Sequence, residues 1–246
     1  MNKRKRYKRK IKILNFLAEL SGSAIFSTLY FIFISRYLSP DFNFDIIILG
    51  LLIGASYFAA VYIPFHTYKI HIIPFISIIR ALQKRKWEII YYKIPAQFIG
   101  AFIGTLIFYQ FSMLSNTPIN VSEMWNYKVL STADLMFFNA LTVFVLCYLF
   151  YVIQLLFKNM GFTSTFFYAL VIQVVFIFTC QINEISAINL FGYLSLYILD
   201  GNPGFTHDFV MSALIHVLVP SAIALIIYYY IRDRFLNRQT NTRTLY

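Results

Sequence analysis

The sequence predicts an all-α membrane protein, with six transmembrane helices and two re-entrant half-helices arranged as an inverted repeat. Its composition is the first reason: 59% of the 246 residues are hydrophobic and only 13% are charged. A soluble domain of this length cannot bury so much apolar surface. The other two reasons are the lengths of the apolar segments and the placement of the basic residues between them.

Six apolar segments are long enough to cross a hydrocarbon core about 30 Å thick, which takes about 20 helical residues. Two further apolar pieces, Ile70–Ile79 and Ser186–Leu199, are too short to cross and are flanked by polar residues. The short pieces are therefore expected to enter the membrane without spanning it. The six expected spans are 13–35, 43–65, 88–113, 133–157, 163–182 and 208–231.

The basic residues gather in segments that a six-span topology places on one side of the membrane. The chain has 21 Lys and Arg against 10 Asp and Glu. Most of the basic residues lie in the first twelve positions, the loop 66–87 and the tail 232–246. Lys and Arg in short loops face the cytoplasm, so we expect a multi-pass protein of the cell membrane with both termini cytoplasmic. The expected partner is the lipid bilayer and not nucleic acid, and the opening cluster could also bind anionic lipid.

Each half of the chain has the order span, span, short piece, span. Three crossings per half invert the second copy relative to the first, as in many transport proteins. The expected units are a basic amino terminus (1–12), a first repeat (13–114), a linker (115–132), a second repeat (133–231) and a tail (232–246).

Five motifs along the chain resemble those of the major intrinsic proteins, the aquaporin and aquaglyceroporin family. AELSGSAIF (Ala18–Phe26) is similar to the family's AE-x-x-G-T, and YKIPAQFIGAFIG (Tyr92–Gly104) to Y-x-x-A-Q-x-x-G-A. KIHIIPFIS (Lys69–Ser77) resembles G-A-H-F-N-P-A-V-T, and SAINLFGYL (Ser186–Leu194) resembles A-x-x-N-P-A-R-S-L. VPSAIAL (Val219–Leu225) is similar to G-P-x-x-G-A. The motifs have the order and spacing of the family.

The resemblance implies that each half-helix starts at a box that the family writes Asn-Pro-Ala. Here the first box keeps its proline but lacks the amide, and the second keeps its asparagine but lacks the proline. Proline suits the first position of a helix because its missing N–H would have no partner there. The boxes read Ile73-Pro74-Phe75 and Asn189-Leu190-Phe191.

The resemblance also implies a pore constriction at Ile53, Ile177, Ser186 and Gly192. Gly192 stands where the family has its pore arginine, so the implied constriction is wide, apolar and uncharged. Losing a guanidinium removes a five-donor anchor and a positive barrier against cations. Such a pore suits weakly polar solutes, or it closes by dewetting.

Three polar residues in apolar surroundings are further candidates. An intramembrane carboxylate such as Glu19 is costly, and the resemblance implies that it braces a loop by accepting hydrogen bonds. His71 is expected to line the pore, and Gln97 to lie near the pore or to bond between helices. Gly100, Ala101 and Gly104 are expected to allow close helix packing.

The sequence has no recognisable nucleophile, phosphate-binding loop or paired carboxylates, and its histidines lack metal-ligand spacing. We therefore expect no enzyme activity, cofactor or metal. The leading expectation is a channel for passive passage of water or small uncharged solutes. The alternatives are a non-conducting scaffold or partner subunit of the same fold, and a proton-coupled carrier using Glu19. The resemblance implies a homotetramer.

Overall fold

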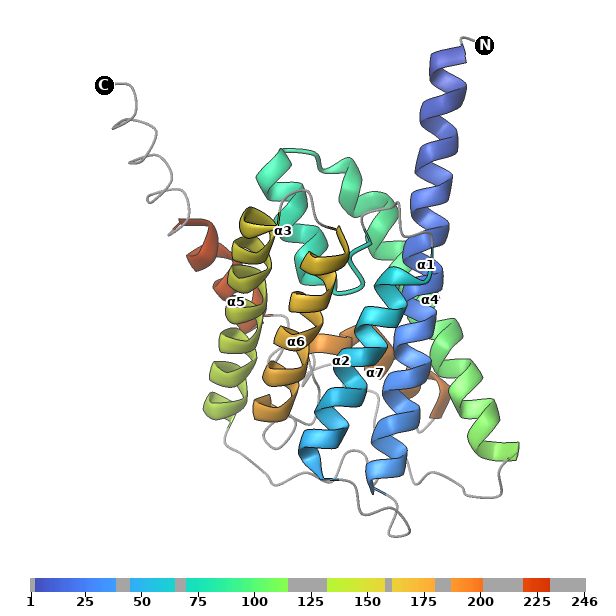
Figure 1. Ribbon diagram of the computed structural model, residues 1–246, viewed down its shortest axis with the longest axis vertical. Helices are drawn as coiled ribbons and strands as arrows, with labels where there is room; N and C mark the ends of the chain where they lie inside the picture. Colours follow the sequence, from blue (N-terminus) through green and yellow to red (C-terminus); the bar gives the residue numbers. More distant parts are fainter. Residues whose placement is uncertain are drawn as a thin grey trace.

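The computed structural model describes residues 3–38, 45–64, 70–114, 132–157, 161–179, 187–200 and 219–230, and every regular element among them is helical (Figure 1). Val219–Tyr230 forms a further helix, which carries no label. The labelled elements are α1 (Lys3–Leu38), α2 (Ile46–Tyr62), α3 (Pro74–Lys84), α4 (Glu88–Leu114), α5 (Thr132–Leu156), α6 (Gly161–Thr179), the 3-10 turn η1 (Ala187–Asn189) and α7 (Leu190–Asp200).

Four of these helices are long and apolar enough to cross a membrane, which is the pattern of a multi-pass membrane protein. They contain the stretches Lys10–Leu38, Glu88–Leu114, Met136–Leu156 and Gly161–Thr179. Their outward faces expose large apolar side chains, as contact with lipid requires. The all-α class and the membrane character that the sequence predicts are confirmed in this coarser form.

The expected span 43–65 is longer than the helix in the structure. α2 has 17 residues, or about 26 Å at 1.5 Å per residue, against about 30 Å for a hydrocarbon core. It begins after Asp45, whose carboxylate accepts a 3.4 Å hydrogen bond from the Ile47 N–H, and Pro64 lies just beyond its end. Of the expected span 208–231, only 219–230 lies within the described residues.

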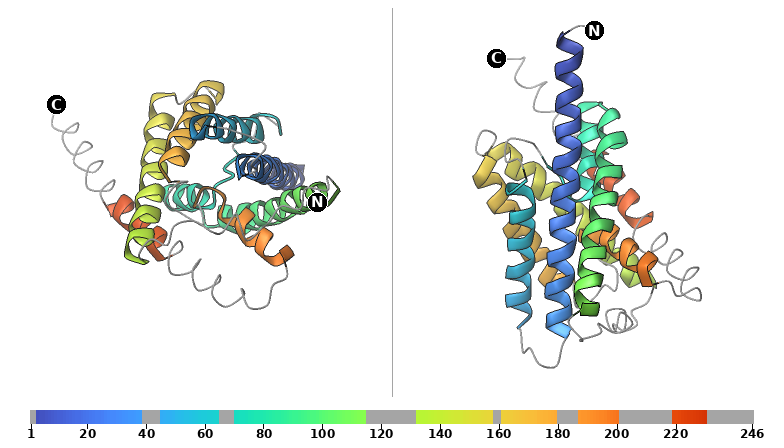
Figure 2. Two further views of the ribbon diagram at one scale, coloured as in Figure 1. Left: turned by 90° about the horizontal axis from the view of Figure 1, so that it is seen from below. Right: turned by 90° about the vertical axis from the view of Figure 1, so that its right-hand side faces the viewer.

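The helices form a closed ring when viewed along the bundle (Figure 2, left). α1 packs against α2 and α4, α2 against α6, and α6 against α5, while α3 lies between α4 and α5 and closes the ring. α7 packs against α4. α1 and α4 run in the same direction and α2 runs in the opposite one (Figure 1).

Glycines set the closest helix crossings. A Cβ added at Gly100 would lie 2.1 Å from the Leu20 carbonyl oxygen, and one at Gly104 would lie 2.2 Å from the Ala24 oxygen. Gly54 of α2 meets the backbone of α6 in the same way. α1 and α4 can touch backbone to backbone only because these positions lack a side chain. The expected close packing at Gly100 and Gly104 is confirmed.

The turn between α3 and α4 reverses the chain through one left-handed residue. Arg85 has φ 50° and ψ 39°, and its N–H donates to the Leu82 carbonyl at 3.2 Å. The Lys86 N–H donates to the Ala81 carbonyl at 3.0 Å, so the helix ends in a Schellman-type cap. Glycine or asparagine usually occupies this position, because a side chain with a Cβ is strained there.

Replacing Arg85 with Gly is expected to raise the free energy of unfolding by about 1 kcal/mol, since the left-handed strain disappears. The measurement is unfolding of the purified chain in mixed micelles by sodium dodecyl sulfate. Lys86→Gly, at the next position along the same turn, is the control and should not stabilise the chain. Equal or lower stability of Arg85→Gly would contradict the strain at this turn.

Candidate functional site

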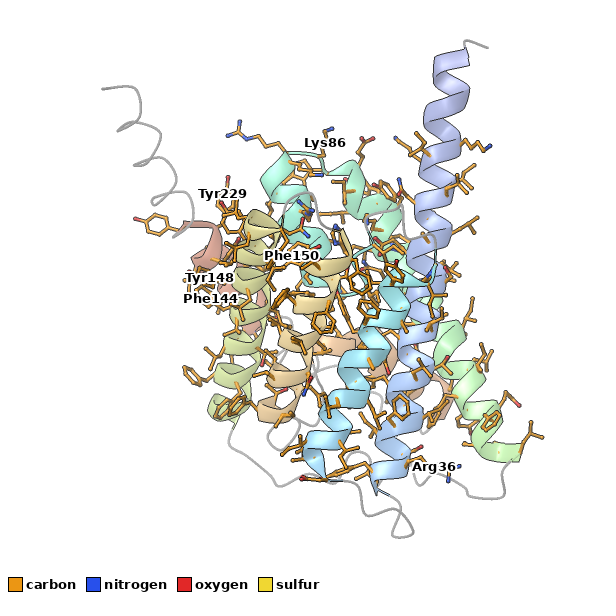
Figure 3. The ribbon with its side chains drawn as sticks, viewed as in Figure 1. Arg36, Lys86, Phe144, Tyr148, Phe150 and Tyr229 are labelled. Carbon is orange, nitrogen blue, oxygen red and sulfur yellow. The ribbon has the colours of Figure 1, made fainter. Side chains whose placement is uncertain are left out.

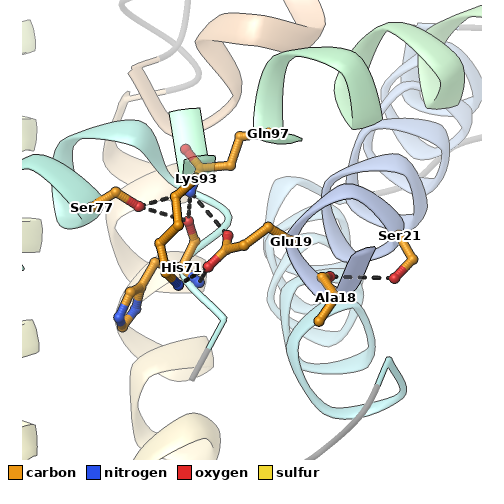
Figure 4. Close-up of polar contacts among 7 residues, drawn as sticks. All are labelled: Ala18, Glu19, Ser21, His71, Ser77, Lys93 and Gln97. Carbon is orange, nitrogen blue, oxygen red and sulfur yellow. Dashed lines mark hydrogen bonds and ion pairs between the residues drawn. The ribbon is translucent and has the colours of Figure 1, made fainter. Parts of the chain in front are cut away.

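A cluster of polar side chains lies buried between α1, α4 and the start of α3 (Figure 4). Glu19 of α1 is its centre and is 0% exposed. Its carboxylate accepts a 2.9 Å hydrogen bond from the His71 backbone N–H and a 3.0 Å bond from the Gln97 side-chain amide. It also forms an ion pair with the ammonium of Lys93, which is buried too.

The second half of the cluster fixes the segment that leads into α3. The same Gln97 amide nitrogen lies within hydrogen-bond distance of the His71 carbonyl and, at 2.8 Å, of the Ser77 hydroxyl, so its two N–H groups are shared among three acceptors. Ser77, in the first turn of α3, also donates to the His71 carbonyl at 3.4 Å. Both backbone groups of His71 are thus bound. Buried backbone that is not helical needs hydrogen-bond partners for its N–H and C=O groups. Side chains of α1 and α4 supply those partners for His71, three residues before Pro74.

The local sequence explains why these side chains meet. Lys93 and Gln97 are four residues apart on α4, so they lie one above the other on the same face. Gly100 lies about one turn after Gln97 on α4, and its lack of a side chain lets α4 approach the backbone of α1 beside Glu19. This close approach brings Lys93 and Gln97 within reach of the Glu19 carboxylate. Pro74 occupies the first position of α3 and Ile73 its cap, so the helix starts where the sequence predicts.

Sequence reasoning did not single out two members of this cluster, Ser77 and Lys93. A signal for Lys93 was nevertheless present. Glu19 is the seventh residue of the expected span 13–35, and Lys93 is the sixth of 88–113. In the expected topology both spans enter the membrane from the same side, so these two charges, which lie inside their spans, fall at nearly the same depth, where opposite charges are expected to pair.

The imidazole of His71 faces away from this cluster, toward α5. Its ring meets Phe150 edge to face at 5.4 Å. Arg80 of α3 lies over the same Phe150 ring at 5.5 Å and donates a 2.9 Å hydrogen bond to Gln154. Cation–aromatic and hydrogen-bond contacts therefore hold α3 to α5.

The second short helix begins at another buried amide. Asn189 is 5% exposed, and its Oδ1 accepts a 3.0 Å hydrogen bond from the Ser27 hydroxyl of α1. Its Nδ2 has no hydrogen-bond partner within the described part of the chain. A Cβ at Gly192 would lie 2.4 Å from that nitrogen, so any side chain at 192 would displace the Asn189 amide.

α1 thus holds the starts of both short helices. Glu19 and Ser27 are eight residues apart, about 12 Å along the helix axis, on either side of the middle of 13–35. The box residues lie in the interior or against a neighbouring helix. Ile73, Phe75 and Leu190 are buried, and Phe191 meets Phe98 of α4 edge to face at 5.6 Å.

Three of the four expected constriction residues lie within the described residues, and each of them lies on a different helix. Ile53 is fully buried on α2, and Ile177 of α6 lies over Gly50 in the crossing of α2 and α6. Gly192 faces α4, where its carbonyl accepts a 3.4 Å hydrogen bond from Thr105. Ser186 lies outside the described residues.

Aromatic rings fill the interior next to these positions, and sequence reasoning missed them. Tyr30 of α1 is 0% exposed and meets Phe176 and Tyr193, the neighbours of Ile177 and Gly192, at 5.9 and 5.8 Å. The hydroxyls of Tyr30 and Tyr193 are 3.3 Å apart. The signal was the large share of aromatic residues, 20%, with several at helical spacing in 26–31.

The ring contacts continue from Tyr193 at the start of α7 to His71 before α3. Edge-to-face and tilted pairs of this kind, with centroids 5.0 to 6.0 Å apart, stabilise an aromatic core. The region between the two helix starts is therefore packed with side chains. The series runs through Tyr193, Tyr30, Phe26, Tyr57, Tyr168, Phe150 and His71.

The fold and this site define a class: an all-α, multi-pass membrane protein with a buried ion pair at the start of one short helix. At the start of another, a buried amide nitrogen has no hydrogen-bond partner among the described residues. No protein-family model matches the chain, and no curated protein matches its sequence. Among the described residues, no group of His, Cys, Asp or Glu side chains has the arrangement of a metal site.

Proposed function

We propose that the chain has the aquaporin-like architecture that its motifs resemble, and that it is a channel for passive passage of water or small uncharged solutes. In this proposal six segments span the membrane, with both termini in the cytoplasm. α3 and α7 are half-helices that enter from opposite sides. Three features support it: the opposite sense of α1 and α2, the position of α3 nearer the N-terminal end of the bundle than α7 (Figure 1), and the anchoring of both helix starts to α1.

The observation that carries the proposal is the Asn189 amide. A buried N–H donor without a partner destabilises a protein by about 1–3 kcal/mol, so such groups are rare and call for an explanation. Donation to a solute oxygen at the start of α7 would satisfy the group. The amide lies where a Cβ at position 192 would be, so glycine at this position allows Asn189 to keep its side chain at the start of α7.

The charges around the site favour an uncharged solute. Glu19 and Lys93 neutralise each other, and the described residues near Asn189 are neutral hydroxyls, glycine and aromatic rings. An ion would lose its hydration here without a fixed counter-charge, at a cost of several kcal/mol. A small neutral solute would meet one amide and a largely apolar wall.

A second candidate is the non-conducting scaffold or partner subunit, and the aromatic series favours it. Tyr30 contacts both Phe176 and Tyr193, and in the proposed architecture these three rings would block passage at the level of Gly192. The channel proposal then requires these rings to move. The carrier alternative finds less support, because Glu19 is already engaged by Lys93, Gln97 and the His71 N–H.

Stopped-flow light scattering of proteoliposomes under water, glycerol and urea gradients tests the channel. We expect faster volume changes than in empty liposomes for at least one of the three. Tyr30→Ala should raise that flux several-fold, because it removes the ring that joins Phe176 to Tyr193. Tyr91→Ala is the control, since Tyr91 is exposed on the outer face of α4.

Two outcomes separate the candidates. Flux in Tyr30→Ala but not in the native chain would indicate a channel that is closed by its rings. No flux in either, from folded and inserted protein, would contradict the channel and leave the scaffold. In that case a stable complex with another membrane protein, and the expected homotetramer, become the properties to measure.

A further inference from the structure

We propose that the basic end of the bundle binds the anionic headgroups of the membrane in which the protein is embedded. The surface consists of two parts that lie at the same end: the amino-terminal turns of α1 and the exposed turn Lys84–Lys86. Lys86 and Arg36 mark opposite ends of the molecule in Figure 3. This inference does not depend on the passage of any solute.

The helix α1 continues as an uninterrupted rod through the basic residues. It begins at Lys3 and projects beyond the other helices (Figures 1 and 2). A 2.8 Å ion pair between Lys12 and Glu88 joins α1 to the start of α4 and marks the base of the projection. The basic residues before that base are Lys3, Arg4, Lys5, Arg6, Lys8, Arg9 and Lys10, with no acidic residue among them.

The dimensions place this projection at the lipid headgroups. Between Lys12 and Arg36, α1 has enough residues to cross a core about 30 Å thick. The headgroup layer adds about 6 Å on each side, and screening at physiological salt limits the reach of a charge beyond it to about 8 Å. Lys3 lies about 14 Å beyond Lys12 along the helix, so every charge of the projection falls within this distance.

Two observations at the turn Lys84–Lys86 also support the binding of anionic lipid headgroups. Trp87 and Tyr91, which follow the basic turn, are 55% and 79% exposed, and such residues are enriched at the membrane–water interface. Arg85 occupies the left-handed position where glycine would be less strained. It stands between two lysines in the sequence, so three consecutive positive charges lie where α3 ends, at this end of the bundle.

Quenching of Trp87 fluorescence by brominated lipids tests the proposal. Trp125→Phe leaves Trp87 as the sole tryptophan. The full chain is reconstituted in phosphatidylcholine vesicles with a minor fraction of phosphatidylglycerol, and bromine is carried by one lipid or the other near the headgroup. At equal mole fractions, we expect brominated phosphatidylglycerol to quench at least about twofold more than brominated phosphatidylcholine, because the basic residues concentrate it locally.

Two sets of variants assign the effect to the surface. The excess should fall when Lys3, Arg4, Lys5 and Arg6 are replaced with Gln, and also in Lys84→Gln/Lys86→Gln, but it should persist in Arg36→Gln at the other end. Equal quenching by both lipids in the native chain would overturn the proposal, as would an excess unchanged in both basic-end variants. Saturable binding of soluble polyphosphate together with equal quenching would assign the surface to a soluble polyanion, and would also overturn it.

Discussion

Replacing Lys93 with Met is expected to lower the free energy of unfolding by about 3–5 kcal/mol, because it leaves the Glu19 carboxylate buried without its counter-charge. The measurement is unfolding by sodium dodecyl sulfate in mixed micelles, followed by tryptophan fluorescence. Removing the charge opposite a buried ion destabilises a protein far more than removing both members of the pair.

The double variant Glu19→Gln/Lys93→Met distinguishes the ion pair from simple packing. A Gln at 19 still has an oxygen for the His71 N–H and carries no charge that needs Lys93. We therefore expect the double variant to lie within about 1 kcal/mol of the native chain. A double variant as unstable as Lys93→Met would show that the ammonium acts by filling space and not by its charge.

Replacing Gly100 with Ala should be nearly as damaging, although it adds only a methyl group. The new Cβ would meet the Leu20 carbonyl oxygen at 2.1 Å, and the clash is with backbone, which no rotamer change relieves. Separating α1 from α4 would also draw Gln97, one turn away, from the Glu19 carboxylate. We expect a loss of about 3 kcal/mol in the same unfolding assay.

Gly161→Ala is the matched control, because a Cβ at Gly161 meets nothing within 4 Å. Its stability should stay within about 0.5 kcal/mol of the native value. A Gly100→Ala variant as stable as Gly161→Ala would refute the backbone contact between α1 and α4.

The features that sequence reasoning captured are those set by local chemistry. Apolar length indicated which segments are helical, the proline at 74 marked where α3 begins, and the spacing of Gly100 and Gly104 marked a close crossing. Glu19 was singled out because a carboxylate in an apolar run is costly. Each of these signals lies within a few neighbouring residues.

The features that were missed depend on partners far apart in the chain. Lys93 gains its role only because α4 packs against α1, and Tyr30 because Phe176 and Tyr193 come to it from other helices. The limits of α2 were missed because Asp45 and Pro64 shorten an apolar run that reads as a full span. The contact between Gly192 and the Asn189 amide was also missed, because it depends on how the 3-10 turn η1 leads into α7.

The most direct test of the proposed architecture is the side from which each short helix can be labelled. Single cysteines are introduced at Lys84 and at Asp200, the far ends of α3 and α7, after Cys147→Ala and Cys180→Ala. A membrane-impermeant maleimide is applied to vesicles of known orientation, with Lys12→Cys and Arg36→Cys as reference points for the two sides. We expect Lys84→Cys to label with Lys12→Cys, and Asp200→Cys with Arg36→Cys. Labelling of both short-helix cysteines from the same side would contradict two half-helices that enter from opposite faces, and with them the proposed channel.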